Sequence, residues 1–217
     1  MVEDLKIAPQ DGAETPERGD AASAKRRQVL AGARKVFLSR GFAAASMGEI
    51  AKAAGVSKGT LYVYFDSKDA LFRALIEEQR RNTAERITRL DPENHDIEAV
   101  LAGFAERLMT EMSAPDHVGL VRAVIGAAED FPDLGRVFFE SGPGFGARRL
   151  AAWLQAQEEA GALTLDEPEA AAWRFLGSCA QPTLTATLLG QPRPAPEEIA
   201  RRARSVAAAF FAAHRPR

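Results

Sequence analysis

The chain has 217 residues, of which 27% are charged and 46% hydrophobic, and its formal net charge is −2. This length suffices for one large or two small domains with a substantial core. The sequence has no apolar run near the ~18 residues of a membrane-spanning helix, and no charged-then-apolar leader. We therefore expect a cytoplasmic protein with no membrane partner. The single cysteine, Cys179, excludes an internal disulfide and fits a reducing compartment.

The near-neutral total conceals one strongly basic segment. Residues 25–74 carry ten basic and three acidic side chains, a net charge of +7, whereas residues 1–24 carry −4 and residues 75–217 carry −5. Because phosphate contacts supply most sequence-independent affinity for DNA, only the middle segment suits a polyanion. A basic segment is also commonly a solvated surface, so charge alone leaves both interpretations open.

The N-terminal region is expected to be an unstructured arm followed by a helix. Residues 1–21 are acidic, polar and without hydrophobic periodicity, which predicts disorder. From about Ser23 the apolar residues recur at helical spacing, and Gly41 is expected to end this first helix.

Two short helices joined by a tight turn are predicted next. Ser46 and Glu49 form a capping box at the start of the first, and Gly55 supplies the left-handed conformation that ends it. Ser57 caps the second. A longer helix follows from Asp66 or Ser67 to about Asp91. The outer face of the second short helix carries hydroxyl and ammonium groups that can bind phosphates and base edges, which predicts a DNA-binding surface.

The amino-acid sequence of this region supports that prediction. The run IAKAAGVSKGTLYVYFDSKDAL, at residues 50–71, together with Gly41 and Phe42, resembles the DNA-binding domain of the TetR family of bacterial regulators. The resemblance implies an all-α homodimer with a three-helix helix-turn-helix domain at residues 22–74, whose two short helices occupy about 45–65. It also implies that residues 75–217 form a helical effector-binding and dimerisation domain. DNA contacts carried over from the family pattern are Ser46, the backbone amide of Met47, Ser57, Lys58, Gly59, Thr60, Tyr62, Tyr64 and Lys68.

The remainder of the chain is predicted to be helical throughout. Proline and glycine positions separate its amphipathic segments. The expected segments are 96–112, 116–129, 131–140, a turn-rich joint at Gly142, Pro143, Gly144 and Gly146, a helix ending at Gly161, 168–189 and 195–213. The run FPDLGRVFFESGP, at residues 131–143, is similar to an AefR-like subgroup of the family, which suggests a small-molecule sensor.

Two sets of apolar residues in this body are functional candidates. An effector pocket could be lined by Phe104, Leu108, Met112, Ile125 and Trp153, although such helical stripes are more often plain core. In the family the last two helices pair with those of a second copy, which places a dimer interface at Trp173, Leu176, Leu184, Leu188, Ile199, Val206 and Phe210. The same helices could instead pack within one protomer.

No residue pattern indicates catalysis or metal binding. His95, His117 and His214 match no metal-ligand spacing, and no nucleophile elbow or phosphate-binding loop is present. Cys179 is expected to be a small buried hydrophobe, since nothing indicates the exposure and low pKa of a redox sensor. We expect no enzyme, no cofactor and no metal.

Together these features predict a repressor that binds a palindromic operator as a homodimer and is released by a small-molecule effector. The same fold could act as an activator or as a regulator without a ligand. A further alternative is a metabolite-binding helical protein whose DNA-binding domain is vestigial.

Overall fold

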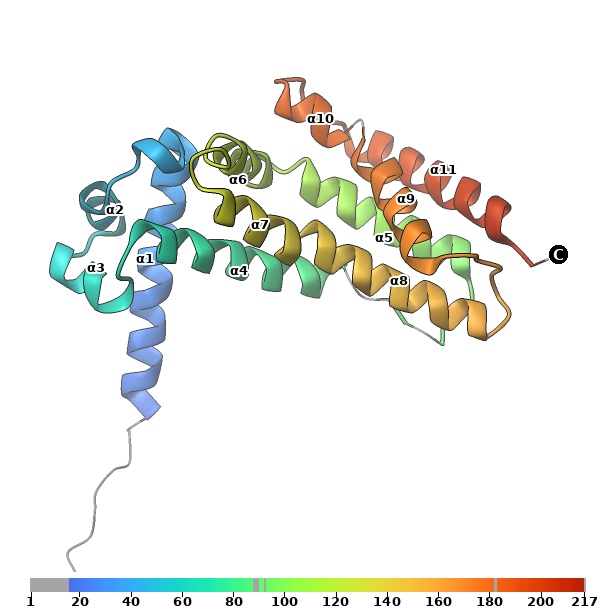
Figure 1. The fold of residues 1–217 in the computed structure, drawn as a ribbon, viewed down its shortest axis with the longest axis horizontal. Helices are drawn as coiled ribbons and strands as arrows, with labels where there is room; N and C mark the ends of the chain where they lie inside the picture. Colours follow the sequence, from blue (N-terminus) through green and yellow to red (C-terminus); the bar gives the residue numbers. More distant parts are fainter. Residues whose placement is uncertain (1–15, 88–89, 92, 182, 217) are drawn as a thin grey trace, which may run out of the picture.

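The computed structural model describes residues 16–87, 90–91, 93–181 and 183–216, and within them the chain is helical without strands (Figure 1). Side chains are described from residue 22 onward, except those at 80–89. The helices run α1 (Pro16–Ala44), α2 (Met47–Ala54), α3 (Lys58–Tyr64), α4 (Lys68–Ile87), α5 (Ile97–Met112), α6 (Pro115–Ile125), α7 (Pro132–Ser141), α8 (Pro143–Glu159), α9 (Pro168–Ala180), α10 (Thr183–Leu188) and α11 (Pro196–His214). The prediction of an all-α fold is confirmed.

The first helix begins earlier than the sequence predicted. Residues 16–21 belong to α1, so this part of the arm predicted at 1–21 is helical, while residues 1–15 lie outside the described part of the chain. Pro16 suits a first helical position because its fixed φ is compatible with a helix and its missing N–H is not needed there. Gly41 interrupts the helix as predicted, with φ 75° and ψ 170°.

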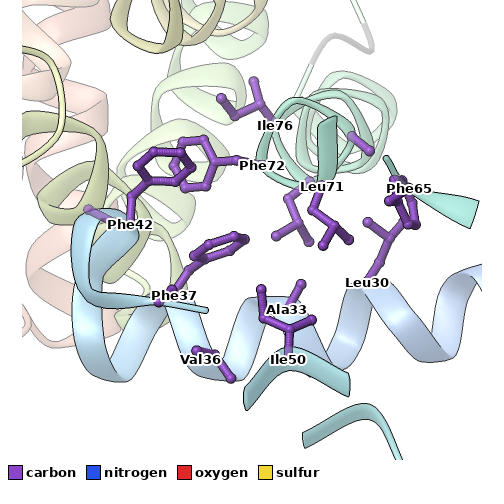
Figure 2. Close-up of a cluster of buried hydrophobic side chains, with 14 of the residues drawn as sticks. Leu30, Ala33, Val36, Phe37, Phe42, Ile50, Phe65, Leu71, Phe72 and Ile76 are labelled. Atoms are coloured by element: carbon purple, nitrogen blue, oxygen red, sulfur yellow. The ribbon is translucent and has the colours of Figure 1, made fainter. Parts of the chain in front are cut away.

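A first hydrophobic core holds α1 to α4 together. Aromatic rings form its centre: Phe72 lies edge-on to Phe37 and Phe42, with ring centres 5.1 Å apart in both pairs. Figure 2 shows these rings between α1 and α4, with Leu30, Leu71 and Ile50 beside them. Full burial of each large apolar side chain contributes about 1.5–3 kcal/mol, so this cluster is a main source of stability for the N-terminal domain.

This core does not stop at residue 74, where the sequence placed a domain boundary. Leu120 and Val124 of α6 and Leu134 of α7 are buried in the same cluster, and Phe131 packs on Phe42 with ring centres 5.0 Å apart. Helical periodicity indicates which side of a helix is buried, but it does not show which helices that side meets. The N-terminal domain therefore shares its core with α6 and α7.

A second core lies in the body, on α5, α8, α9 and α11 (Figure 1). Phe175 of α9 is its centre, with Phe104 at 6.1 Å and Phe210 at 5.3 Å between ring centres. The helix α11 packs along α5, and α8 packs along α9. Helix α4 runs from the N-terminal domain into this body, as Figure 1 shows.

Two predicted segments of the body differ from the structure. The turn-rich joint at residues 142–146 is mostly helix: only Gly142, with φ −102° and ψ −97°, separates α7 from α8, and Pro143 begins α8. Conversely, the single helix predicted at 168–189 is two helices. Gln181, which precedes Pro182 in the sequence, has ψ 138° and ends α9, because the residue before proline avoids the helical region. None of the described helices combines the length and the apolar character that crossing a bilayer requires.

Candidate functional site

Helices α2 and α3 are set by the local signals that the sequence displays. The backbone N–H of Glu49 donates to the Ser46 hydroxyl at 3.3 Å, and the Ser46 N–H donates to the Glu49 carboxylate at 3.1 Å, which is a complete capping box. The hydrogen bond from Ser46 and the nearby Arg40 guanidinium, 2.7 Å from the carboxylate, lower the pKa of Glu49. The capping carboxylate is therefore stable in its ionised form.

The turn between the two helices has the conformation that only glycine adopts freely. Gly55 has φ 64° and ψ 38°, and the N–H of Val56 donates to the carbonyl of Ala51 at 3.0 Å. Ser57 then begins α3: its hydroxyl accepts the N–H of Thr60 at 3.0 Å and pairs with the Thr60 hydroxyl at 2.9 Å. Helix α3 therefore leaves α2 in a fixed direction.

Helix α1 supports this pair through a close contact. A Cβ added to Gly32 would lie 2.5 Å from the Cβ of Ala54, so only glycine allows α1 and α2 to approach this closely. Beside it, the amide Nε2 of Gln28 donates to the carbonyl of Ala54 at 2.7 Å. The Arg26 guanidinium lies 5.0 Å from the centre of the Phe65 ring, at the end of α3.

The predicted DNA contacts on α3 lie mainly on its exposed face. Ser57, Lys58, Gly59 and Tyr62 are exposed, as is Ser46 at the start of α2, whereas Thr60 and Tyr64 are half-buried and Tyr64 packs against the first core. These placements leave the DNA contacts themselves as predictions.

Four residues bear on these predicted contacts. Val63 was not predicted but is 79% exposed, so α3 also presents an apolar side chain at its surface. Gly48, which is a poor helix former, gives room to a neighbour: a Cβ there would lie 3.1 Å from the Cε of Lys58. Lys68 is less available than predicted, since its Nζ donates to the carbonyl of Ala43 at 3.1 Å and lies 4.5 Å from the centre of the Phe42 ring. Met47, at the first position of α2, is half-buried against the first core.

A cavity of about 330 Å³, partly open to solvent, lies between helices of both cores. Apolar side chains form most of its wall. They include Ile76 of α4, Phe104, Leu108 and Met112 of α5, Leu120 and Val121 of α6, Phe138 of α7, Phe145 of α8, Trp173 and Leu176 of α9, and Leu184 of α10. Its size lies within the range of about 300–1,000 Å³ that is typical of small-molecule sites.

A small polar group interrupts this wall. Gln79 of α4 donates from Nε2 to the Glu111 carboxylate of α5 at 2.9 Å, and His117 of α6 lies near Glu111. Burial lowers the pKa of His117, and the Glu111 charge opposes this only in part, so the ring is neutral near pH 7. The Nδ1 atom of His117 is buried and has no hydrogen-bond partner among the described residues.

Three of the five predicted pocket residues, Phe104, Leu108 and Met112, lie in the cavity wall. The other two were misplaced. Ile125, the last residue of α6, is 62% exposed. Trp153 is buried in the second core, where its Nε1 donates to the carbonyl of Asp91 at 2.9 Å. Both belong to apolar stripes, and periodicity does not say which part of a stripe faces a cavity.

Sequence reasoning missed the polar side of this cavity. His117 had a usable signal, since it precedes Val121 by four residues and Val124 by seven on the apolar face of α6. Gln79 and Glu111 had none, because their pairing depends on how α4 crosses α5.

Several predicted dimer-interface residues lie inside the protomer. Ile199 and Phe210 are buried in the second core against α5 and α9, which corrects their assignment to an interface. Trp173, Leu176 and Leu184 line the cavity, Val206 packs partly buried against the second core, and Leu188 is half-buried. The apolar stripe of α11 is thus satisfied by its own protomer.

Cys179 is fully buried in the second core, and this burial raises the pKa of its thiol to about 12. Such a thiol stays protonated and behaves as a packing group. Among the described residues, no three His, Cys, Asp or Glu side chains gather as a metal site.

The capped α2–turn–α3 unit on a basic domain, joined by α4 to a helical body that contains a cavity, defines a helix-turn-helix protein. Comparisons with known families agree. The profile described as "Bacterial regulatory proteins, tetR family" matches residues 29–75, and that of the AefR-like transcriptional repressor C-terminal domain matches residues 99–216. The chain belongs to the TetR family of bacterial transcriptional regulators.

Solved structures support the same assignment over nearly the whole chain. A TetR-family transcriptional regulator from Mesorhizobium loti MAFF303099 has a TM-score of 0.81 and 27% identity, covering 89% of this chain and 98% of that one. The flavonoid-responsive regulator FrrA has a TM-score of 0.77 and 34% identity, covering 90% of this chain and 99% of that one.

Curated relatives match mainly in the N-terminal part. The transcriptional repressor Rv1474c of Mycobacterium tuberculosis is 40% identical over 65 residues, which are 30% of this chain and 35% of that protein. The repressor AcnR of Corynebacterium glutamicum is 29% identical over 104 residues, covering 43% of this chain and 55% of that protein. The match therefore spans about a third to about half of the length of these relatives.

Proposed function

We propose that the protein is a transcriptional repressor that binds a palindromic operator as a homodimer and leaves it when a small molecule enters the cavity. One observation carries this proposal: the helices that line the cavity also form the core of the DNA-binding domain. Leu120 of α6 belongs to both the cavity wall and the first core, and so does Ile76 of α4.

The DNA-binding step rests on α3. In a dimer, two copies of this helix would enter successive major grooves, with half-sites about 34–36 Å apart or a multiple of that distance. Lys58 and Tyr62 are exposed on α3, where an ammonium and a phenol can reach phosphates or base edges. The acidic body would point away from the duplex.

Contacts between α6 and α1 provide a route by which the cavity could influence this helix. A Cβ on Gly119 of α6 would lie 2.7 Å from the Cδ2 of Leu38, so the Leu38 side chain of α1 packs closely on the backbone of α6 at this point. Next to this contact, the Arg34 guanidinium of α1 lies 3.3 Å from the Asp116 carboxylate of α6. Arg34 also donates to Gln79 Oε1 of α4 at 3.1 Å. A ligand that displaced α4 or α6 would therefore shift α1.

Dimerisation would use surfaces that the protomer leaves uncovered. On α9, Arg174, Gly177 and Ser178 are exposed. On α11 the exposed residues include Ser205 and Ala209, which are small enough for close helix approach. A two-fold axis through this face would make the contact self-complementary.

Relatives guide the choice of effector to test. Rv1474c and AcnR are described as repressors, and FrrA as flavonoid-responsive. Because FrrA resembles this chain over 90% of its length, flavonoids are a first panel of compounds.

The primary test is binding of the purified protein to fragments of its own upstream DNA, in competition with bulk DNA and across a salt series. We expect a footprint on a palindrome. Lys58→Ala should weaken binding to all sequences and reduce the salt slope by about 1, because one phosphate contact is lost. The control is Arg149→Ala, which removes an exposed charge on α8 in the body. Equal losses for both variants would contradict the assignment of α3.

Release by the effector has its own test. If a compound releases the operator, operator DNA must weaken binding of that compound by the same factor, since the coupling free energy is reciprocal. Equal affinities of a saturating compound for free and DNA-bound protein would refute the release mechanism.

A further inference from the structure

We propose that the cavity binds a planar aromatic molecule, and that this ligand stacks on Trp173 at the mouth of the cavity. The inference rests on the proposed function, in which the cavity holds the effector. It names the chemical class of the effector and the residue that selects it. A saturated ring of the same size should gain less from this site.

The mouth of the cavity lies between α9 and the junction of α7 and α8. Among the described residues of the wall, Gly142, Trp173 and Gly177 are exposed, whereas the others are half-buried or buried. Gly142 separates α7 from α8, and the other two lie one turn apart on α9. A Cβ on Gly177 would meet no described atom of another helix within 4 Å. Of these three residues only Trp173 has a side chain, and at 36% exposure its indole can be reached by a ligand.

The indole of Trp173 is held in place from outside the cavity. The ring of Phe139, on α7, lies nearly parallel to it, with 7° between the ring planes and 5.7 Å between the ring centres. Phe139 is 54% exposed and is not part of the cavity wall, so it supports the indole without occupying the ligand's space. A ring that is already ordered loses little freedom when a ligand binds, which favours stacking on it.

The wall inside the mouth carries further aromatic rings. Phe138 of α7 and Phe145 of α8 line the cavity and are only half-buried, so both keep surface that a ligand can contact. A stacked or edge-on aromatic pair gains about 2- to 10-fold in affinity beyond the effect of burial. Rings from three helices therefore offer an aromatic ligand a gain that an aliphatic ligand does not receive.

Burial of apolar surface alone predicts the opposite preference. A saturated ring carries more hydrogens than the aromatic ring with the same carbon skeleton, so it has at least as much apolar surface. The free energy of burial grows with that surface. A cavity that recognised only apolar area would therefore bind the saturated ligand at least as tightly, and a preference for the aromatic ligand reports the contribution of the rings.

Two uncharged ligands with the same carbon skeleton and one primary hydroxyl separate these cases: 2-(2-naphthyl)ethanol and 2-(decahydro-2-naphthyl)ethanol. Their binding to the full-length protein is measured by isothermal titration calorimetry. Each association constant is divided by the partition coefficient of that ligand from water into cyclohexane, which removes the contribution of apolar burial. We expect the normalised constant of the naphthyl compound to be about tenfold the larger. Equal normalised constants, or a larger one for the saturated compound, would overturn the ligand class.

Two variants test the role of Trp173. Trp173→Leu should keep the wall apolar but reduce the normalised preference by about 2- to 10-fold, because one ring contact is lost. Trp173→Phe retains a ring at this position and should retain most of the preference. The control is Ile125→Ala, which removes a side chain that is 62% exposed and outside the cavity wall, and which should leave both affinities unchanged.

The selectivity of the change separates stacking from a purely structural role of Trp173. Loss of a structural contact would weaken both ligands alike, whereas loss of stacking weakens the naphthyl compound more. An undiminished preference in a folded Trp173→Leu protein would refute the role of Trp173. Because the two wild-type constants already decide the ligand class, a variant that fails to fold does not remove the test.

Release of the operator distinguishes this inference from the proposed function. If the naphthyl compound binds with the expected preference but does not release DNA, the ligand class stands and the release mechanism fails. If the saturated compound has the larger normalised constant and releases DNA, the release mechanism stands and the ligand class fails.

Discussion

Replacing Gly32 by alanine should disturb the packing on which DNA binding depends. The new Cβ would lie 2.5 Å from the Cβ of Ala54 and 2.6 Å from its Cα and N atoms. Non-bonded carbons favour separations of about 3.5–4.0 Å, so α2 would have to move by about 1 Å. The atoms in the way belong to a backbone rather than to a flexible side chain, and Gln28 holds the same residue through its carbonyl.

The expected magnitude combines two opposing effects. Overpacking of this kind costs about 1–3 kcal/mol, whereas alanine in place of glycine within a helix gains up to about 1 kcal/mol. We expect a net loss of about 1–2 kcal/mol of stability, together with weaker operator binding because the turn before α3 is displaced. Stability is measured by urea unfolding at an unchanged slope, and binding by titration with operator DNA.

Gly135→Ala is the matched control. It introduces the same methyl group into α7, where the nearest atom to the added Cβ is the Cβ of Ala128 at 3.5 Å, an ordinary van der Waals contact. Its stability should be equal to or greater than that of the wild type, by up to about 1 kcal/mol. If Gly32→Ala unfolded at the same urea concentration as the wild type and bound DNA equally well, the close contact between α1 and α2 would not have the importance assigned to it.

Three further predictions concern the body. Arg34→Met should change the free energy of unfolding by only about 0–1 kcal/mol, because the ion pair of Arg34 with Asp116 is partly exposed. It should nevertheless reduce the effect of a bound ligand on DNA affinity. Unchanged ligand-induced release of DNA in titrations would contradict the role of Arg34. The pKa of His117 is lowered in the folded state, so the stability that its neutral form contributes is complete above pH 6.5 and declines as the pH falls below that value. Between pH 5.5 and 8, the urea midpoint of His117→Phe should therefore fall less at acidic pH than that of the wild type. Parallel curves of urea midpoint against pH for the two proteins would refute this prediction. Cys179, whose thiol pKa is raised to about 12 by burial, should react with dithionitrobenzoate only after unfolding in urea, and stoichiometric labelling of the folded protein would contradict its burial.

The helix-turn-helix was predictable because its signals are local. The capping box at Ser46, the left-handed Gly55 and the cap at Ser57 each act within three or four residues, and each has the predicted conformation. The ends of some other helices are less predictable from the sequence. The break at Gln181 has a local signal in Pro182, whereas the helical conformation of Pro143 to Gly146 differs from the turn that their composition predicts.

The sequence by itself determined the all-helical architecture, the capped α2–α3 pair and the basic domain that carries it, because propensity, capping and charge are properties of neighbouring residues. Only the tertiary structure decided what each apolar face meets. It buried Phe210 and Ile199 within the protomer, and it brought Gln79, Glu111 and His117 together from three helices at one cavity. Hydrophobic periodicity identifies the side of a helix that avoids water, but the partner on that side depends on how helices distant in sequence cross, and that is fixed by the packing of the whole chain.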